Sequence, residues 1–188
     1  MRKFLALLAL VLVAGCSDKP WHATDITGSM PALEFSMMRA SDENAVDAAD
    51  YRGHVVLLYF GYTHCPDVCP TTLANLSDVL AKLGQDADKV RVLFVSVDPN
   101  RDSLPVLKQY TRAFAPQIDG LRGTPNQLAD LARRYRVAYT VKTSPEYTVT
   151  HTSAVFVFDA KGRARLVTLD TNDTAGLTED LQRLIGGE

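Results

Sequence analysis

The sequence has little cysteine, little excess charge and no repetition. Three cysteines occur among 188 residues, so sulfur chemistry is confined to a few positions. Lysine and arginine total 20 against 22 acidic residues, and the net charge of −2 leaves no basic stripe for a phosphate backbone. No internal repeat or low-complexity tract is present. These absences argue against a repeat protein and against nucleic acid as a partner.

The N-terminus carries a short apolar run. Phe4–Val13 follows two basic residues and is too short to span a bilayer comfortably, which is typical of a signal peptide over residues 1–15. The run ends in Leu-Val-Ala-Gly-Cys16, an ending similar to the lipobox of bacterial lipoproteins, in which the cysteine is lipidated. The alternative is an ordinary signal peptide followed by a chance cysteine. We expect lipidation, because small residues directly precede the cysteine.

Lipidation of Cys16 would determine both the location and the organisation of the chain. Acyl chains hold a protein on a membrane surface, so we expect an exported protein, membrane-anchored on the periplasmic side of a bacterial membrane. Residues 16–31 are expected to form a tether, and residues 32–188 the domain. Cys65 and Cys69 then remain as thiols in an oxidising compartment, where such a pair becomes a disulfide unless something reduces it.

Hydrophobic periodicity over the domain predicts strands that alternate with helices. Nearly continuous apolar runs indicate buried strands, and apolar residues at helical spacing indicate helices. The expected strands are Leu33–Met38, His54–Phe60 and Val90–Val97, with a hairpin of Val155–Phe158 and Arg163–Leu169. The expected helices are Thr71–Leu83, Ser103–Phe114 with Ser103 as cap, Thr124–Tyr135 with Thr124 as cap, and Thr174–Ile185.

This order predicts an α/β fold with a central mixed sheet flanked by helices. A cysteine motif between the first buried strand and its helix, where Cys65 and Cys69 lie, is typical of thioredoxin-like domains. We therefore expect a thioredoxin-like fold, with a helical insertion between about Asp98 and Tyr135 and a C-terminal β-hairpin plus helix.

The two cysteines of the motif can act in two ways. Cys65 and Cys69 are four positions apart and face the same side of a helical turn, so they can bind one soft metal ion or form a redox disulfide. Pro70 fits the first turn of a helix, whose N-terminal N–H groups stabilise a thiolate. A thiolate both binds metal and attacks disulfides, so this point does not discriminate. A purely structural disulfide would close a very small loop and add little stability.

His151 is a candidate third ligand. It precedes the strand Val155–Phe158, and in a thioredoxin-like sheet the loop before this strand packs beside the cysteine motif. Two thiolates and one imidazole suit copper, because sulfur favours Cu(I) and nitrogen helps to hold Cu(II). On spacing alone, a histidine satisfied by local hydrogen bonds is an equal alternative.

Two further side chains could support the site. His64 adjoins Cys65 on a different face, and we expect it to tune the thiol rather than to bind metal. Asp98 ends the strand Val90–Val97 on the cysteine side of the sheet, where its carboxylate could lie near the site. It could instead form a turn before Pro99, and the turn is the favoured interpretation.

Three segments of the chain resemble the Sco (SenC) family, copper-binding thioredoxin-like proteins that help to assemble cytochrome c oxidase. These segments are Phe60–Thr71, Ser96–Asp102 and Tyr147–Ser153. The resemblance covers about Asp25 to the end of the chain. Its first segment, which holds both cysteines, is highly specific in combination with the third.

The resemblance implies a function and its site. Cys65, Cys69 and His151 match the family's copper ligands, and the recipient would be the binuclear copper centre of cytochrome c oxidase subunit II. The chain would be a non-enzymatic copper chaperone with a thiol reductant, and another copper carrier, as further candidate partners. Family members often carry Asp directly before this histidine, whereas Thr150 stands here, so a carboxylate that could orient the imidazole is missing.

Two enzymatic alternatives use the same thiols. A thiol-disulfide reductase could act on the copper-site cysteines of the oxidase subunit. Thioredoxin-type reductases, however, place a cis-proline before the strand that faces the motif, and this chain reads Thr152-Ser153-Ala154 there. A peroxidase of the peroxiredoxin or glutathione peroxidase type is disfavoured, because Thr63 lies closer to Cys65 than the peroxiredoxin pattern requires. The reductase is therefore the main alternative to the chaperone.

Overall fold

The computed structural model describes residues 19–188. The expected signal peptide, residues 1–15, and the expected lipidation site Cys16 lie outside the described residues. Between residues 19 and 188, no helix has both the length and the apolar character needed to cross a membrane.

The described chain is built around a mixed sheet. Its strands are Thr24–Asp25 (β1), Ser36–Arg39 (β2), Ala45–Asp47 (β3), Val55–Gly61 (β4), Val90–Ser96 (β5), Ile118–Arg122 (β6), Tyr139–Lys142 (β7), Thr148–His151 (β8), Val155–Phe158 (β9) and Ala164–Thr168 (β10). Eight of them form one sheet in the order β1-β10-β9-β4-β5-β6-β2-β3. Strands β4, β5 and β6 are parallel, and β9 and β2 join them antiparallel. The central sheet is therefore mixed, as predicted.

Strands β4 and β5 lie at the centre of the sheet because their residues are apolar on both faces. Every residue of β4 is buried, and β4 pairs with β5 along its whole length. The largest buried side chains of the two strands are Tyr59, Phe60 and Phe94. A strand buried on both faces appears in a sequence as a continuous apolar run, so both strands were predicted to within one residue at each end.

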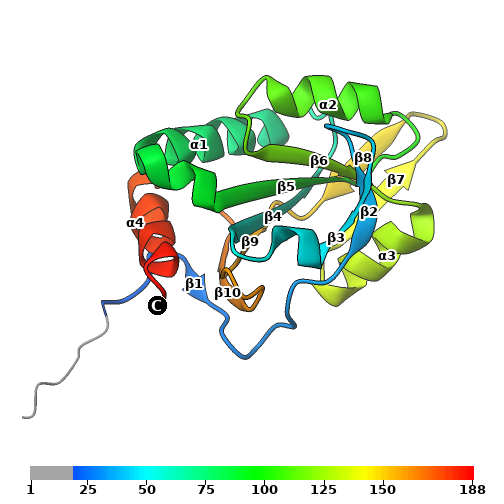
Figure 1. The fold of residues 1–188 in the computed structure, drawn as a ribbon. Coiled ribbons are helices and arrows are strands. Elements are labelled where there is room, and N and C mark those ends of the chain that lie inside the picture. Colours follow the sequence, from blue (N-terminus) through cyan, green and yellow to red (C-terminus); the bar gives the residue numbers. More distant parts are fainter. Residues whose placement is uncertain (1–18) are drawn as a thin grey trace, which may run out of the picture.

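Helices cover both faces of this sheet. They are Val68–Leu83 (α1), Leu104–Arg112 (α2), Pro125–Arg134 (α3) and Thr174–Ile185 (α4), with 3-10 helices at Ala48–Tyr51 and Gly84–Lys89. Figure 1 shows α1 and α2 above the sheet and α3 below it. Helix α4 packs beside α1. On the face of α3, the ring of Tyr135 contacts those of Phe156 and Phe158 at centroid distances of 5.7 and 5.4 Å.

Both predicted helix caps are present. The side chain of Ser103 accepts a hydrogen bond from the N–H of Val106, and that of Thr124 accepts one from the N–H of Gln127. The Gln127 side chain accepts in turn from the N–H of Thr124 at 2.8 Å, which completes a capping box. These short-range bonds explain why the starts of α2 and α3 were readable from the sequence.

The predicted helical insertion between Asp98 and Tyr135 is wrong in one respect, since it also contains a strand. Strand β6 lies between α2 and α3 and pairs in parallel with β5. Its sequence, Ile-Asp-Gly-Leu-Arg, has low β propensity. A Cβ on Gly120 would lie 3.1 Å from the Cβ of Leu107, so a small residue is required where α2 crosses the strand. The place of β6 beside β5, rather than its local sequence, makes it a strand.

The second half of the expected tether, residues 16–31, is part of the folded domain. Strand β1 extends the main sheet by pairing antiparallel with β10, and Thr24 lies opposite Val167. The N–H of Ile26 donates to the carbonyl of Arg165 at 2.9 Å. The domain therefore begins before residue 32, and polar composition alone did not reveal this pairing.

Side chains of α4 complete the attachment of this segment. The guanidinium of Arg183 lies 3.8 Å from the ring centroid of Trp21. The carboxylate of Asp180, which has no exposed surface, accepts hydrogen bonds from the N–H groups of His22 and Ala23 at 3.1 and 2.8 Å. A buried acceptor and a cation over an aromatic ring therefore hold the segment at the C-terminal helix.

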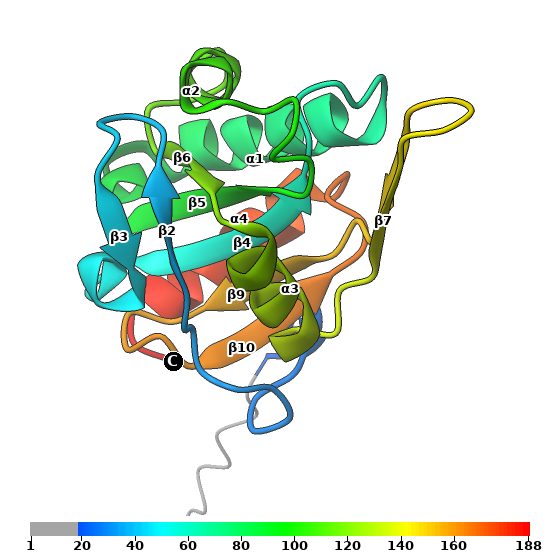
Figure 2. The same ribbon diagram turned by 90° about the vertical axis from the view of Figure 1, so that its right-hand side faces the viewer.

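Strands β7 and β8 form a separate two-stranded sheet, which the sequence did not predict. Tyr139 pairs with His151 at its base, and Lys142 pairs with Thr148 near its tip. Figure 2 shows this hairpin projecting at the edge of the body. His151 is the last residue of β8, so the hairpin determines where its imidazole lies.

Candidate metal centre

The two cysteines of the motif lie where β4 is followed by α1, Cys65 in the connecting loop and Cys69 in the first turn of the helix. Strand β4 ends at Gly61, and α1 begins at Val68 with Asp67 as its N-cap residue. The Asp67 side chain makes no capping hydrogen bond, so N–H groups of the first turn remain available to other acceptors. Both cysteines are free thiols, with Cys65 partly exposed and Cys69 buried.

The sulfur of Cys65 occupies this helix N-terminus. The backbone N–H of Cys69 donates to Cys65 Sγ at 3.4 Å. Burial by itself would raise the pKa of Cys65, but the N–H groups of Asp67 and Cys69 outweigh it, and the pKa of Cys65 is lowered. The helix start therefore favours a thiolate at Cys65.

Cys69 has the opposite acid–base character because it is buried. Its side chain has no exposed surface, and burial raises the pKa of Cys69 to about 12. A Cβ on Gly61 would lie 3.0 Å from Cys69 Sγ, so a glycine at the end of β4 leaves room for this sulfur. Cys69 keeps its proton at neutral pH unless a metal cation replaces it.

His151 brings a nitrogen donor to the two sulfurs. Its Nε2 lies 3.3 Å from Cys69 Sγ, and its Nδ1 lies 3.0 Å from the carbonyl oxygen of Thr152. A carbonyl can only accept, so Nδ1 carries the proton and the lone pair of Nε2 faces the sulfur. Burial lowers the pKa of His151, which favours the neutral imidazole that binds metals.

Two tyrosines surround this imidazole. The rings of Tyr59 and Tyr62 meet the ring of His151 edge-on, at centroid distances of 6.0 and 5.8 Å. The hydroxyl of Tyr62 donates to the carbonyl of Val149 at 3.3 Å and so connects β8 to the residue that follows β4. The imidazole is therefore held by aromatic edges as well as by the backbone.

The three predicted ligands come together. The donor atoms of Cys65, Cys69 and His151 all lie within 4.8 Å of one another. Two sulfurs and one imidazole nitrogen form a soft donor set that suits copper. The hydroxyl of Tyr59 is buried beside the Cys69 thiol. A hydroxyl at this place can donate to a metal-bound thiolate and stabilise its negative charge, so these residues fit a copper ion.

The position directly before His151 carries no carboxylate, and a backbone group orients the imidazole instead. Thr150 is exposed and lies opposite Thr140 in the hairpin. The carbonyl of Thr152 accepts the hydrogen bond from Nδ1. A main-chain carbonyl thus orients the imidazole in place of a neighbouring carboxylate.

His64 is placed beside the site but outside the donor group. Its side chain is about half exposed, and its Nδ1 lies 3.1 Å from Thr63 Oγ1 and 3.7 Å from Asp102 Oδ1. In the described chain, the possible metal ligands that lie together with the two cysteines include His151 but not His64. The expectation that His64 tunes the thiol stays a prediction.

Asp98 is fully buried, and in the described chain it is not among the possible metal ligands grouped with the two cysteines. Its carboxylate accepts a hydrogen bond from the hydroxyl of Tyr147 and pairs with the guanidinium of Arg101. The favoured turn is present as well, because its backbone carbonyl accepts from the N–H of Arg101 at 3.1 Å. Asp98 is therefore both a turn residue and the centre of a polar cluster.

Asp102 is a buried carboxylate that sequence reasoning missed. It accepts hydrogen bonds from the N–H and the hydroxyl of Thr63 at 3.1 and 2.6 Å, and from the hydroxyl of Ser96 at 2.6 Å. These bonds hold the loop that leads to Cys65. The sequence offers one signal for Asp102, which is an acidic residue shortly after a buried strand. Its contact with Thr63 joins segments far apart in the sequence, so that signal does not reveal the contact.

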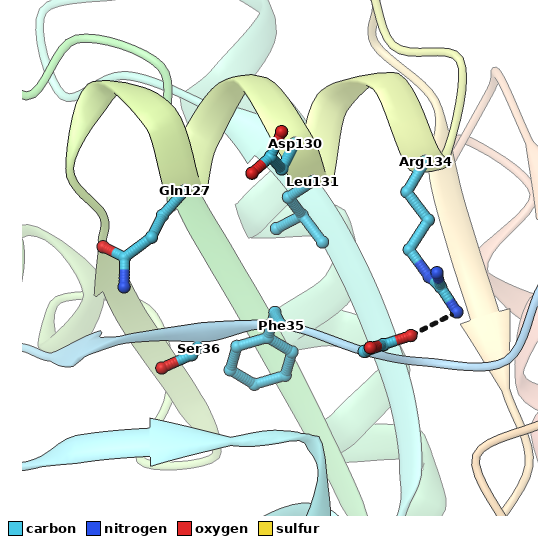
Figure 3. A pocket seen from close by; sticks show the side chains of 7 residues that line it. Phe35, Ser36, Gln127, Asp130, Leu131 and Arg134 are labelled. Carbon is cyan, nitrogen blue, oxygen red and sulfur yellow. Dashed lines mark ion pairs between the residues drawn. The ribbon is translucent and has the colours of Figure 1, made fainter.

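A groove of about 360 Å³ lies elsewhere, between α3 and the segment before β2 (Figure 3). Phe35 and Leu131 supply its apolar lining. Arg134 and Glu34 form an ion pair across one end at 2.7 Å. Neither a cysteine nor a histidine lines this groove, so it does not contribute to the metal centre.

A family model described as SCO1/SenC matches residues 27–186. The mouse (Mus musculus) "Protein SCO2 homolog, mitochondrial" is 40% identical over 119 residues, which cover 61% of this chain and 47% of that protein. The chain thus spans about half the length of this relative.

Two solved structures are similar over most of the chain. ScoI of Bradyrhizobium japonicum with copper bound is 36% identical with a TM-score of 0.74, and the match covers 81% of this chain and 98% of that one. The solution structure of apo Sco1 from Thermus thermophilus is 34% identical with a TM-score of 0.79, and the match covers 89% and 99%. Sco structures are thioredoxin-like, so the predicted fold class is confirmed.

Proposed function

Because this chain belongs to the SCO1/SenC family, whose members take part in copper binding and cytochrome oxidase assembly, we propose that it is a copper chaperone. It binds one copper ion through Cys65, Cys69 and His151 and helps to assemble the binuclear copper centre of cytochrome c oxidase. The observation that carries this proposal is the convergence of two sulfurs and one imidazole nitrogen within 4.8 Å. Such a set can hold Cu(I) through sulfur and Cu(II) with the help of nitrogen.

Loading requires both thiols in the reduced state. A disulfide between Cys65 and Cys69 must accept two electrons and two protons before its sulfurs can bind a metal. A dithiol partner supplies them and leaves as its own disulfide. A second copper carrier is a candidate source of the metal.

Copper leaves by ligand exchange with thiols of the acceptor, which we propose is subunit II of the oxidase. Cys65 is partly exposed, whereas Cys69 is buried. An incoming thiolate can therefore reach the metal on the Cys65 side first. His151 and Cys69 hold the ion until the exchange is complete.

The location proposed for this activity is the periplasmic side of a bacterial membrane. The support is the apolar run Phe4–Val13 and the small residues before Cys16, which we propose is lipidated. Mass spectrometry of the membrane-extracted protein tests the anchor, because a lipidated Cys16 adds the mass of the acyl groups.

Anaerobic copper titration of the reduced protein tests the chaperone proposal. We expect one copper per chain against a modest competitor, loss of stoichiometric binding in a Cys65→Ser, Cys69→Ser double variant, and weaker binding in His151→Ala. Thr150→Ala is the matched control, because this exposed residue adjoins His151 and offers no ligand. Tight copper binding that survives in the double variant would contradict the proposal.

A thiol-disulfide reductase is the second candidate, favoured by the unequal thiols. Cys65 is partly exposed with a lowered pKa, as an attacking thiol requires. Against this function, the chain reads Thr152-Ser153-Ala154 before β9, where thioredoxin-type reductases carry a proline. A reductase does not need an imidazole ligand, so disulfide turnover that is unchanged in His151→Ala would favour this candidate.

A further inference from the structure

The hairpin of β7 and β8 carries His151 but is not part of the main sheet. Cys65 lies in the loop between β4 and α1 and Cys69 lies in α1, both in the body, whereas His151 belongs to the separate hairpin (Figure 2). An isolated two-stranded hairpin is at best marginally stable in water. The distance between His151 and the sulfurs therefore depends on side-chain contacts that attach the hairpin to the body.

Two of these contacts are made by residues of β8. The hydroxyl of Tyr62 donates to the carbonyl of Val149 at 3.3 Å, and His151 Nε2 lies 3.3 Å from Cys69 Sγ. The second contact is itself part of the proposed copper site and must rearrange when the metal binds. It cannot by itself keep the ligand in place.

A third attachment lies toward the hairpin tip, at Tyr147, which directly precedes β8. The hydroxyl of Tyr147 donates to Asp98 Oδ1, and the guanidinium of Arg101 pairs with Asp98 Oδ2. The same guanidinium lies 4.0 Å from the centroid of the Tyr147 ring. Tyr147 is thus held through its hydroxyl by a carboxylate and through its ring by a cation.

The body side of this contact is rigid. Asp98 has no exposed surface, and its backbone N–H donates to Ser96 Oγ at 3.1 Å. Ser96 is the last residue of β5, at the centre of the sheet. A buried carboxylate fixed at the end of a central strand gives the hairpin a stationary attachment point.

We propose that Asp98, Arg101 and Tyr147 form a hairpin latch that keeps His151 Nε2 within reach of the two sulfurs. The latch residues do not touch the metal, so they are positioning residues. The inference deepens the proposed copper site and rests on it for its functional consequence. Cu(I) is held mainly by the two sulfurs of the body, whereas Cu(II) needs the imidazole, so the latch sets the affinity for Cu(II).

Hydrogen exchange of the metal-free protein tests the latch without reference to copper. Tyr147→Phe removes only the hydroxyl that reaches Asp98. We expect amides of Thr148 to His151 to exchange about ten-fold faster, as expected for loss of a hydrogen bond to a charged acceptor. Tyr139→Phe is the matched control. Tyr139 belongs to the same hairpin, and within residues 19–188 its hydroxyl makes no hydrogen bond. This substitution should leave these exchange rates unchanged.

Copper binding by the same two variants tests the consequence. In Tyr147→Phe we expect Cu(II) affinity to fall about ten-fold and the nitrogen hyperfine coupling in the Cu(II) electron paramagnetic resonance spectrum to weaken, with Cu(I) affinity within a factor of three of wild type. Arg101→Lys, which keeps the positive charge, should lose less Cu(II) affinity than Arg101→Gln. A merely structural role would not separate the two copper valences in this way.

The two proposals fail differently. Unchanged hydrogen exchange of the hairpin amides in Tyr147→Phe overturns the latch, whatever the copper affinities are. Faster hairpin exchange in a protein whose wild type binds no copper upholds the latch as a hairpin attachment and overturns the chaperone proposal. Equal losses of Cu(I) and Cu(II) affinity in Tyr147→Phe would show that the latch does not act through the His151 imidazole.

Discussion

At the scale of single residues, the site combines two thiols of opposite acid–base character. Cys65 lies at a helix N-terminus, where backbone N–H groups lower its pKa, and Cys69 is buried with a pKa raised to about 12. One sulfur is therefore ready to exchange ligands, and the other is protected from solvent. This asymmetry matches a carrier that must both hold a metal and release it.

Alkylation by iodoacetamide tests this asymmetry. A lowered pKa means that Cys65 becomes a thiolate at a lower pH than an ordinary thiol, whereas Cys69 stays protonated until about pH 12. We expect at least ten-fold faster modification of Cys65 than of Cys69 at pH 8, measured by peptide mass spectrometry. In the denatured chain the two rates should be equal, and equal rates in the folded chain would show that the asymmetry does not exist.

The residues of the site were largely readable from the sequence, since Cys65 and Cys69 lie close together along it. The prediction that His151 lies near the two cysteines depended on the family resemblance. Spacing alone left a histidine satisfied by local hydrogen bonds as an equal alternative. Asp102 was missed because its contact with Thr63 depends on how two loops pack. Short-range chemistry is therefore readable from a single sequence, and contacts between distant loops are not.

At the scale of elements, the C-terminal end of β4 is where the sheet makes room for the metal centre. A Cβ on Gly61 would lie 2.4 Å from Cε2 of Phe94 and 3.0 Å from Cys69 Sγ. The central strand thus carries a glycine for close packing rather than for a positive φ. Strand, helix start and buried sulfur are fitted to one another at this point.

Gly61→Ala tests the fit. Overpacking against Phe94 should lower the free energy of unfolding by about 1–3 kcal/mol, and displacement of the Cys69 sulfur should weaken Cu(I) binding. Chemical denaturation and copper competition measure the two effects. Gly186→Ala, at the end of α4 where the nearest atom to a Cβ is 3.3 Å away, is the control and should change either quantity little. Wild-type stability in Gly61→Ala would show that the packing there is loose.

The elements themselves were predicted where local signals are strong. Helix α4 was predicted at its observed bounds, and the starts of α2 and α3 follow from their caps. Strand β6 was missed because Ile-Asp-Gly-Leu-Arg becomes a strand only beside β5. The β7–β8 hairpin was missed because each of its strands is four residues long, and Val149 is the one buried residue of the two.

At the scale of the whole molecule, the N-terminal segment is attached to the last helix. Trp21 lies beneath Arg183, and the buried carboxylate of Asp180 accepts two backbone hydrogen bonds from the segment. A domain anchored near residue 16 would therefore be held close to its anchor rather than at the end of a long flexible tether. Such an attachment would limit how far the copper site can move from the membrane.

Asp180→Ala tests this attachment. Loss of the acceptor leaves the N–H groups of His22 and Ala23 unpaired, so we expect the segment to detach and stability to fall by about 2 kcal/mol. Trp21 is the single tryptophan of the chain, so its emission should shift to longer wavelength as the indole enters water. Glu179→Ala is the neighbouring control, because its contacts with Lys19 and His22 are solvent-exposed and their loss should change stability little. Unchanged emission in Asp180→Ala would rule out the carboxylate as the anchor.

The copper site is tested most directly by X-ray absorption spectroscopy of the copper-loaded protein, in the wild type and in His151→Ala. We predict two sulfur ligands and one imidazole nitrogen in the Cu(II) form, with the nitrogen lost or replaced by solvent in the variant and both sulfurs retained. A wild-type spectrum without an imidazole contribution, or one that His151→Ala leaves unchanged, would contradict a copper centre formed by Cys65, Cys69 and His151.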